Sequence, residues 1–354
     1  MANHEEFGAE TEASTVAEAF SSQIANKVIL ITGVNAGGIG GSTTEALAAH
    51  SPKLLILSGR SQNKVEEVIA KVKLLHPDVN CRYLHLDLSS QRSVRAAAKE
   101  VLSYSDVPQI DILINNAGVM NIPDRTVSED GIEMQFATNH IGHFLFTNLI
   151  VSKLIGSSKG SAKGATRIVN VSSRGVRFSP VRFSDLNFTK AVDQLPESER
   201  PDLGTMKAFF YEIDMTGAYH GMVAYGQSKT ANVLFSLSLT ERLYSQHGIM
   251  SFGVHPGAIL TELSRHSDPA ATTEAALDRY RSMGMVFKTL AAGAATTLVA
   301  ALDPKLPPAD KGGKGVYMED CQIAETKSWA TDPVAAEKLW NVSEELVGEK
   351  FLSK

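Results

Sequence analysis

Residues 32–40 read TGVNAGGIG and lie between a β-branched run at residues 27–32 and a helical pattern at residues 42–50. A glycine-rich turn between a first strand and a helix lets the backbone approach a pyrophosphate closely, and free N–H groups at the helix start favour its charge. A glycine cluster alone is also compatible with an ordinary tight turn. Its place after the first strand of a βαβ pattern favours a dinucleotide-binding turn.

Short β-branched runs alternate with longer helical patterns along most of the chain. This alternation predicts a parallel sheet with helices on both faces. Seven strands are expected, at residues 27–32, 53–58, 81–86, 110–114, 167–171, 249–254 and 315–318. Helices are expected at residues 42–50, 63–76, 91–104, 129–154, 225–246 and 283–302. We therefore expect an α/β protein with a doubly wound Rossmann fold and a seven-stranded parallel sheet.

The chain has 354 residues, of which 43% are apolar and 21% charged, so it can bury a sizeable core. No composition shift divides it, and we expect a single domain at residues 27–320. Residues 1–26 are an acidic extension, with five acidic side chains and no Lys or Arg in the first 20. They account for the net charge of −5, which disfavours nucleic acid as a partner. Residues 321–354 are expected to form a helical extension.

The sequence gives no sign of a membrane span or of secretion. The longest uncharged stretch, residues 134–152, contains Gln, Asn and His side chains and fits a membrane span poorly. The N-terminus lacks the basic and then apolar pattern of a signal peptide. Cys81 and Cys321 are the two cysteines, and they have no metal or redox spacing. We expect a reduced, cytoplasmic location.

Arg60 follows the second predicted strand, where a dinucleotide-binding fold meets the adenosine ribose. An acidic residue there would accept hydrogen bonds from a free ribose 2′-hydroxyl, whereas an arginine suits a 2′-phosphate. No acidic residue is nearby. The pattern therefore predicts NADP(H) as the cofactor, with a solvated loop arginine as the alternative.

Tyr225 and Lys229 are four positions apart, so on a helix they share one face. A nearby ammonium favours the phenolate, which makes a tyrosine usable as an acid or base. On most helices such a pair lies on the surface, but here it follows the fifth predicted strand. Ser173, at the end of that strand, can hydrogen-bond a carbonyl oxygen that gains negative charge, although Ser172 is the alternative.

An ordered set of motifs resembles the short-chain dehydrogenase/reductase family over residues 27–320. The motifs are residues 32–40, Asp87 after the third strand, residues 115–118 (NNAG) after the fourth, Tyr225 with Lys229, and Pro256-Gly257 with Thr261. Residues 139–144 (NHIGHF) and 169–173 (VNVSS) are similar to the retinol-dehydrogenase-like and WW-domain-oxidoreductase-like branch.

This resemblance implies an NADP(H)-dependent oxidoreductase that interconverts a carbonyl and an alcohol of a small molecule. It implies Ser173, Tyr225, Lys229 and Asn139 as the catalytic set. Asn139 would anchor a water relay to the lysine, unless it only satisfies a backbone carbonyl inside its helix. The implied cofactor-binding residues are Gly33, Asn35, Gly37, Gly38, Ile39, Gly40, Arg60, Asp87, Leu88, Asn116, Ala117, Gly118, Tyr225, Lys229, Pro256, Gly257 and Thr261.

Two other functions remain open at this point, an NADP-binding regulatory protein without turnover and a scaffold that uses the acidic N-terminus. The intact Ser, Tyr and Lys set disfavours both, because a sensor does not need all three. The helices at residues 129–154 and 225–246 resemble the family's usual dimer-forming pair, so a homodimer is possible. No metal is expected, because His140, His143 and His255 lack carboxylate partners at ligand spacing and fit packing roles.

Two features depart from the family's pattern. Four residues separate Gly33 and Gly38, where the family's turn has three, so Gly37 is a second candidate for a phosphate-facing glycine.

Tyr225 lies 52 positions after Ser173, which is a longer separation in sequence than the family commonly shows. We expect the intervening residues 174–222 to face the substrate, with a satellite cluster on the outside as the alternative. The expected lining residues are Phe178, Phe183, Phe188, Phe209, Phe210 and Tyr211, with Asp185 or Glu212 fixing a polar substituent.

Overall fold

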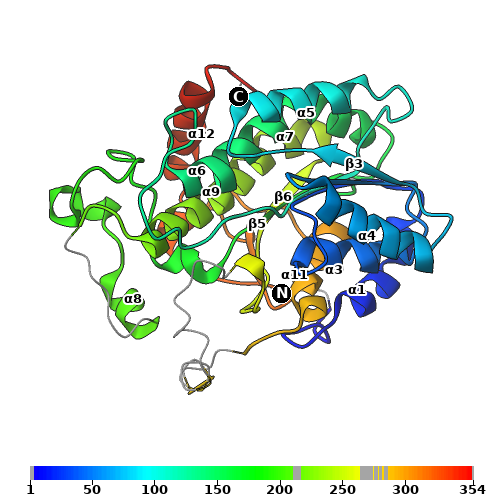
Figure 1. The fold of residues 1–354 in the computed structure, drawn as a ribbon, viewed down its shortest axis with the longest axis horizontal. Helices are drawn as coiled ribbons and strands as arrows, with labels where there is room; N and C mark the ends of the chain where they lie inside the picture. Colours follow the sequence, from blue (N-terminus) through cyan, green and yellow to red (C-terminus); the bar gives the residue numbers. More distant parts are fainter. Residues whose placement is uncertain are drawn as a thin grey trace.

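The computed structural model describes residues 4–209, 217–263 and 286–352, with Glu274, Asp278, Arg281 and Ser282 between them. In this part of the chain a sheet has the strand order β3-β2-β1-β4-β5-β6-β7-β8 (Figure 1). The strands are β1 (Val28–Thr32), β2 (Leu54–Gly59), β3 (Cys81–His85), β4 (Ile112–Asn115), β5 (Arg167–Val171), β6 (Met250–His255), β7 (Tyr317–Glu319) and β8 (Gln322–Ile323). The first seven pair in parallel, which confirms the doubly wound α/β fold.

The eighth strand, β8, was not predicted, and it pairs antiparallel with β7. Asp320 and Cys321 connect the two strands, and both have a positive φ, 51° and 63°. Two-residue turns of this kind match the twist of a hairpin but normally carry Asn-Gly or Asp-Gly. Because cysteine rarely adopts this conformation, the sequence held no turn signal, and the prediction of seven strands was one too few.

Helices cover both faces of the sheet (Figure 1). They are α1 (Ala13–Ala19), α2 (Ser21–Ile24), α3 (Ile39–Ala48), α4 (Gln62–Leu75), α5 (Gln91–Ser103), α6 (Met134–Phe136), α7 (Gly142–Ser158), α8 (Leu203–Phe209), α9 (Gly221–His247), α11 (Leu290–Leu302) and α12 (Pro333–Val347). A π-helix spans Ala137–Ile141, and short 3₁₀ helices span Arg174–Arg177, Val192–Gln194, Glu197–Glu199 and Ser328–Ala330. In the described part of the chain, no helix is long and apolar enough to span a bilayer.

The core has one layer on each side of the sheet. Helices α5, α7, α9 and α12 share a cluster with Val28 and Leu30 of β1, whereas α1, α3, α4 and α11 share one with Ile29 and Ile31. Successive residues of a strand point to opposite faces. Because both faces are covered, β1 is apolar throughout, as is usual for parallel strands.

Three of the predicted helices start four or more residues away from the expected position. The helix expected at residues 129–154 begins at Met134, where the Glu133 side chain caps it by accepting a hydrogen bond from the Phe136 N–H. The helix expected at 225–246 begins at Gly221. The helix expected at 283–302 begins at Leu290, and residues 283–285 lie outside the described residues.

The C-terminal helix α12 covers part of the face at which a homodimer was expected. Ser343 of α12 contacts His140 at 2.8 Å, and Ser238 of α9 donates a hydrogen bond to the Ala336 carbonyl oxygen. The Trp340 ring packs 5.0 Å from the ring of Phe144. A helix of the same chain therefore occupies this surface, and the homodimer stays a prediction.

We predict that Trp340→Ala destabilises the protein strongly. The indole is 2% exposed, and its ring lies 4.0 Å below the Arg242 guanidinium. Replacing a buried aromatic side chain of this size by alanine lowers the free energy of unfolding by about 3–5 kcal/mol. Urea unfolding measures the loss, with Val334→Ala as the control, because Val334 lies on the same helix and is 75% exposed. A loss below about 1 kcal/mol would show that α12 is not part of the cooperative core.

Candidate active site

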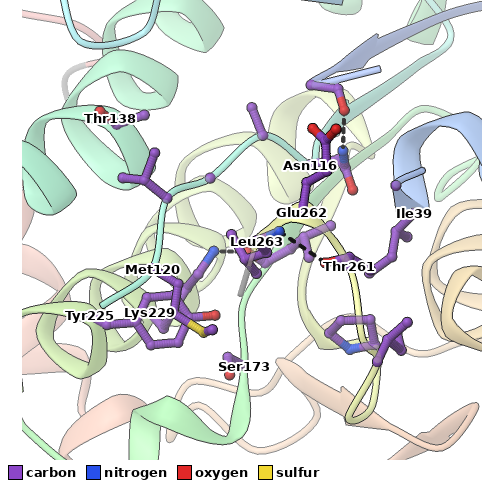
Figure 2. A pocket seen from close by; sticks show the side chains of 18 of the residues that line it. Ile39, Asn116, Met120, Thr138, Ser173, Tyr225, Lys229, Thr261, Glu262 and Leu263 are labelled. Atoms are coloured by element: carbon purple, nitrogen blue, oxygen red, sulfur yellow. Dashed lines mark hydrogen bonds between the residues drawn. The ribbon is translucent and has the colours of Figure 1, made fainter. Parts of the chain in front are cut away.

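A cavity of about 770 Å³ lies at the carboxyl ends of β1, β4, β5 and β6. Ligand sites commonly enclose roughly 300–1,000 Å³, and in doubly wound sheets they occur where the strand order reverses, here between β1 and β4. Figure 2 shows side chains that project into this cavity. The predicted site residues that line it are Gly33, Asn35, Gly37, Gly38, Ile39, Arg60, Asp87, Leu88, Asn116, Ala117, Gly118, Ser173, Tyr225, Lys229, Pro256, Gly257 and Thr261. Gly40 and Asn139 are not among the lining residues.

The glycine turn is built so that backbone segments approach one another closely. Gly33 has a φ of 72°, and a Cβ there would lie 2.5 Å from the Ala117 Cα. A Cβ on Gly40 would lie 2.7 Å from the Gly33 carbonyl oxygen. Gly41, which the sequence analysis did not single out, is held in the same way against the Asn35 carbonyl oxygen. These glycines are therefore required by close packing, and the cradle they form fits a dinucleotide phosphate.

Gly37 and Gly38, the two candidates for a phosphate-facing glycine, differ in how closely they are packed. A Cβ on Gly37 would have no neighbour closer than 3.9 Å, whereas one on Gly38 would lie 2.9 Å from the Asn35 side chain. Gly38 is also the N-cap residue of α3. Gly38 is thus the more closely packed of the two glycines, and the geometry leaves Gly37 replaceable.

The Thr32 hydroxyl ties the ends of β1 and β4 to the π-helix. Its oxygen accepts hydrogen bonds from the backbone N–H groups of Asn116 and Ala117, at 2.9 and 3.0 Å. The hydroxyl hydrogen is then available to His143 Nε2, 2.9 Å away. Burial lowers the pKa of His143 to about 4, so the ring is neutral and Nδ1 carries the hydrogen. His143 Nδ1 therefore donates to the Asn139 carbonyl oxygen at 3.0 Å.

Asn139 is fully buried in the π-helix and is fixed from several sides. Its side-chain amide bonds both the N–H and the carbonyl oxygen of Val119, and its Nδ2 also donates to the Ser228 hydroxyl. Gly118 lies between Asn139 and Lys229, since a Cβ there would be 3.2 Å from Asn139 Oδ1 and 3.4 Å from Lys229 Nζ. The structure thus brings Asn139 close to Lys229 while its side chain also satisfies backbone groups.

Tyr225, Lys229 and Ser173 converge on one part of the cavity (Figure 2). Lys229 Nζ lies 5.6 Å from the centre of the Tyr225 ring and donates a hydrogen bond to the Val171 carbonyl oxygen. Ser173 interacts with the Tyr225 side chain and lowers its pKa. The Ser172 hydroxyl instead donates to the Lys229 carbonyl oxygen at 2.7 Å. Of the two serines, Ser173 is therefore the one that acts on the tyrosine.

Burial shifts both titrating groups toward their neutral forms. Desolvation raises the pKa of Tyr225 to about 12, and the interaction with Ser173 opposes this rise. Desolvation also lowers the pKa of Lys229 to about 7. The tyrosine pKa therefore shifts upward in the absence of a ligand, opposite to the direction that we expected from the neighbouring lysine alone.

The nucleotide end of the cavity lies beside β2 and α4. Arg60 is exposed at the end of β2 and lines the cavity together with Lys64, in the first turn of α4. Lys64 was not among the predicted site residues, although a second basic residue four positions after Arg60, at the start of the next predicted helix, was a usable signal. Asp87 follows β3, and its Oδ1 accepts hydrogen bonds from the Ser89 N–H and hydroxyl.

The cavity takes another part of its lining from residues 174–222. Phe178, Phe209 and Met222 supply apolar side chains there, and Arg174 and His220 supply polar ones. Two of the expected lining residues do not line the cavity: the Phe188 ring packs against Tyr219, and Lys338 lies over the Phe183 ring. This segment therefore combines both expected arrangements, a lining and a satellite cluster.

Of the two polar candidates in this segment, Asp185 does not line the cavity. Asp185 forms a buried ion pair with Arg182 and also accepts hydrogen bonds from Thr189, so the expectation that it meets the substrate was wrong. Phe210, Tyr211 and Glu212 lie outside the described residues.

The three histidines contact protein groups. His140 contacts Ser343, and His255 Nδ1 accepts a hydrogen bond from the Arg174 N–H at 3.2 Å. Within the described ranges, no group of three or more His, Cys, Asp or Glu side chains has a metal-binding arrangement.

The fold and this cavity define a Rossmann-type nucleotide-binding protein. Residues 27–185 match the family model for short chain dehydrogenases. The chain is 36% identical to the chloroplastic short-chain dehydrogenase TIC 32 B of Brassica napus, over 90% of this chain and 88% of that protein. It is 34% identical to retinol dehydrogenase 12 of Mus musculus, over 92% of this chain and 88% of that protein. The chain therefore belongs to the short-chain dehydrogenase family of oxidoreductases, and the resemblance to its retinol-dehydrogenase-like branch is confirmed.

Solved structures agree with this assignment. A crystal structure of an uncharacterized protein from Mycobacterium paratuberculosis has a TM-score of 0.63 and 27% identity, and the match covers 93% of this chain and 96% of that one. An NADPH-bound carbonyl reductase from chicken fatty liver shares the fold, with a TM-score of 0.54 and 19% identity over 87% of this chain and 98% of that one.

We predict that the stability difference between the protein and Lys229→Met depends on pH. The folded-state pKa of Lys229, about 7, lies below its ordinary value of 10.5. Between these values the unfolded chain binds more protons, so the contribution of Lys229 to stability rises with pH. From pH 7 to pH 9 the free energy of unfolding of the parent protein, measured with urea, should rise relative to that of the variant by about 2 kcal/mol. If the unfolding free energies of the two proteins differ by the same amount at both pH values, the pKa of Lys229 is not lowered.

Proposed function

We propose that the protein is an NADP(H)-dependent oxidoreductase that interconverts a carbonyl and an alcohol of a small molecule. The observation that carries the proposal is the convergence of Ser173, Tyr225 and Lys229 in the cavity that the glycine turn borders. A bound nicotinamide supplies or accepts hydride at its C4. The protein has to orient the substrate carbonyl and deliver or remove one proton at its oxygen.

Tyr225 is the proposed proton donor to the forming alkoxide oxygen. With a pKa of about 12 its phenol is protonated at neutral pH, as the reduction direction requires. Ser173, which interacts with the Tyr225 side chain, would also donate a hydrogen bond to the oxygen as negative charge develops there. The Lys229 ammonium would stabilise the phenolate that remains, because it lies 5.6 Å from the ring centre.

Lys229 is also suited to restore the proton on Tyr225. Since burial brings the pKa of Lys229 to about 7, Nζ can gain and lose a proton at neutral pH. Asn139 lies on the other side of Gly118 from Nζ and is rigidly held, which supports the proposal that it anchors a water relay. In this role Asn139 positions the relay and does not itself contact the substrate.

The proposed cofactor site uses the glycine turn for the pyrophosphate and Arg60 for the 2′-phosphate. Gly33 and Gly40 keep the turn close to the end of β4, and Arg60 stands exposed at the end of β2. Asp87 and Leu88, after β3, would border the adenine. Residues 116–118 would support the adenosine from the end of β4, and Pro256, Gly257 and Thr261 would border the nicotinamide half.

The substrate is proposed to be an apolar carbonyl compound or the corresponding alcohol. Phe178, Phe209 and Met222 supply the apolar lining beside Tyr225, and retinol dehydrogenase 12 is a relative. We also propose a cytoplasmic location, which the two free cysteines, Cys81 and Cys321, support. The regulatory alternative, NADP binding without turnover, does not account for three converging catalytic side chains.

We predict that Tyr225→Phe abolishes nearly all turnover but still binds NADPH. The substitution removes only the phenolic hydroxyl, which carries the transferable proton, so kcat should fall by about a thousandfold or more while the NADPH dissociation constant changes little. Tyr244→Phe, on the same helix but outside the cavity lining, is the matched control. If Tyr225→Phe keeps kcat within about tenfold of the parent on every substrate that the parent reduces, the proton-donor role is wrong.

We predict a strong preference for NADPH over NADH, which Arg60→Asp should reverse in part. The carboxylate would repel the 2′-phosphate and accept hydrogen bonds from a free 2′-hydroxyl. Steady-state kcat/KM with each nucleotide measures the preference. Arg92→Asp is the control, because Arg92 is 87% exposed and does not line the cavity. Equal kcat/KM for the two nucleotides in the parent protein would contradict the assignment of NADP(H).

A further inference from the structure

The residues directly after Ser173 form a tight turn that touches both Ser173 and Tyr225. This turn is the 3₁₀ helix Arg174–Arg177. The Gly175 N–H donates a hydrogen bond to the Ser173 hydroxyl oxygen at 3.1 Å, and a Cβ on Gly175 would lie 3.0 Å from Cε1 of the Tyr225 ring. Because Ser173 and Tyr225 both line the cavity (Figure 2), the place of this turn sets how the two side chains lie relative to each other.

Glu319, at the end of β7, holds the turn at its first and last residues. Its Oε1 accepts a hydrogen bond from Arg174 Nε at 2.6 Å and also contacts Nη2 of the same guanidinium. Its Oε2 accepts a hydrogen bond from Arg177 at 3.3 Å and another from the Tyr317 hydroxyl at 3.2 Å. Since β7 is hydrogen-bonded to β6 and β8, the carboxylate is itself fixed to the sheet. Two guanidinium groups thus fasten the turn to β7.

The backbone of the turn has anchors of its own. The Arg174 N–H donates to His255 Nδ1 at the end of β6. Burial lowers the pKa of His255 to about 3, so the ring is neutral and can accept this hydrogen bond. The Trp329 indole N–H donates to the Val176 carbonyl oxygen at 2.9 Å. These bonds do not involve Glu319, so we expect the turn to stay folded, although less firmly held, when the carboxylate is replaced.

The charges make the Glu319 contacts important for the position of the turn. The Glu319 side chain is 8% exposed, and those of Arg174 and Arg177 are 30% and 33% exposed. A carboxylate removed from water to this extent needs charged donors, and hydrogen bonds between charged groups are the strong ones. Without the negative charge the two guanidinium groups would repel each other, and Arg174 directly follows Ser173. Loss of the carboxylate would therefore shift the turn at the end that bears on Ser173.

We propose that Glu319 is a positioning residue for the reaction, because by holding Arg174 and Arg177 it keeps the Ser173 hydroxyl in place beside Tyr225. This inference rests on the proposed reduction of a carbonyl by NADPH. Glu319 does not line the cavity, so it acts through the turn and contacts neither substrate nor cofactor. Its loss should therefore affect the chemical step and leave nucleotide binding unchanged.

The experiment compares Glu319→Gln with the parent protein in three measurements. These are kcat for the reduction of an apolar aldehyde, decanal in the first instance, the NADPH dissociation constant from nucleotide fluorescence, and hydrogen exchange of residues 173–178 in the nucleotide-free protein. The value of kcat is also measured for Ser173→Ala and for the double variant Ser173→Ala/Glu319→Gln. Glutamine keeps the length of the side chain and one acceptor oxygen but removes the charge.

Glu344→Gln is the matched control. Like Glu319, Glu344 is a buried carboxylate that binds a cation, since it lies 2.9 Å from Lys350 Nζ and accepts a hydrogen bond from Trp340 Nε1. It lies on α12 and does not line the cavity. Its replacement should lower the melting temperature without changing kcat, NADPH affinity or the exchange of residues 173–178.

Melting temperatures verify that each variant is folded. If Glu319→Gln does not fold, Arg177→Gln takes its place, because it removes one of the two guanidinium contacts and keeps the carboxylate. Arg177 does not line the cavity, so its substitution also leaves the lining unchanged. The changes expected for Arg177→Gln have the same direction and are smaller.

We expect Glu319→Gln to lower kcat by about tenfold or more, since a catalytic group misplaced by about 1 Å can cost about a hundredfold. Exchange of residues 173–178 should be about tenfold faster, while the NADPH dissociation constant should change by less than about twofold. In the Ser173→Ala background the same substitution should lower kcat by less than about threefold, because the group that Glu319 positions is already absent.

Three results overturn the inference. If exchange is faster but kcat stays within about twofold of the parent value, Glu319 holds the turn without positioning Ser173. If Glu319→Gln lowers kcat equally with and without the Ser173 hydroxyl, Glu319 acts by another route. If the affinity for NADPH falls as much as kcat does, the substitution loosens the whole site. A parent protein that reduces no aldehyde or ketone would instead remove the proposed function and this role with it, and that result is distinguishable because it appears before any substitution is made.

Discussion

The Thr32 hydroxyl is the contact on which the geometry of the site depends. It lies at the end of β1, and it orders the first residues after β4 by accepting hydrogen bonds from Asn116 and Ala117. Through His143 it also fixes the carbonyl oxygen of Asn139. One buried hydroxyl therefore sets the position of the glycine turn relative to β4 and to the π-helix that carries Asn139. Each of these parts borders or supports the same cavity.

Burial of the reacting side chains is the second constraint. Tyr225 and Lys229 are 3% and 2% exposed. Desolvation raises the pKa of Tyr225 and lowers that of Lys229, so it favours the neutral form of both side chains. This arrangement keeps the phenol protonated and brings the lysine close to its titration point at neutral pH. A positively charged nicotinamide would add a charge that favours the phenolate, so the proposed cofactor would itself adjust the tyrosine for the oxidation direction.

Much of the fold could be predicted, because parallel strands read as apolar runs and the glycine turn has a fixed place after the first of them. The candidate site followed from the strand ends, where Ser173 and Pro256 lie. The β7–β8 turn could not be predicted, since Cys321 adopts a backbone conformation unusual for cysteine. Packing decides which aromatic side chains reach the cavity, so Phe183 could not be separated from Phe178. The upward shift of the Tyr225 pKa depends on burial, which the spacing of Tyr225 and Lys229 does not reveal.

The central claim is that the site transfers hydride between NADP(H) and a carbonyl or alcohol group. Incubation of the protein with NADPH that carries deuterium at both C4 positions, together with a panel of apolar aldehydes and ketones, tests it most directly. We expect oxidation of NADPH and an alcohol product that carries one deuterium on the carbinol carbon. Tight NADPH binding with no deuterated alcohol from any member of the panel would contradict it and would favour a dinucleotide-binding regulatory protein.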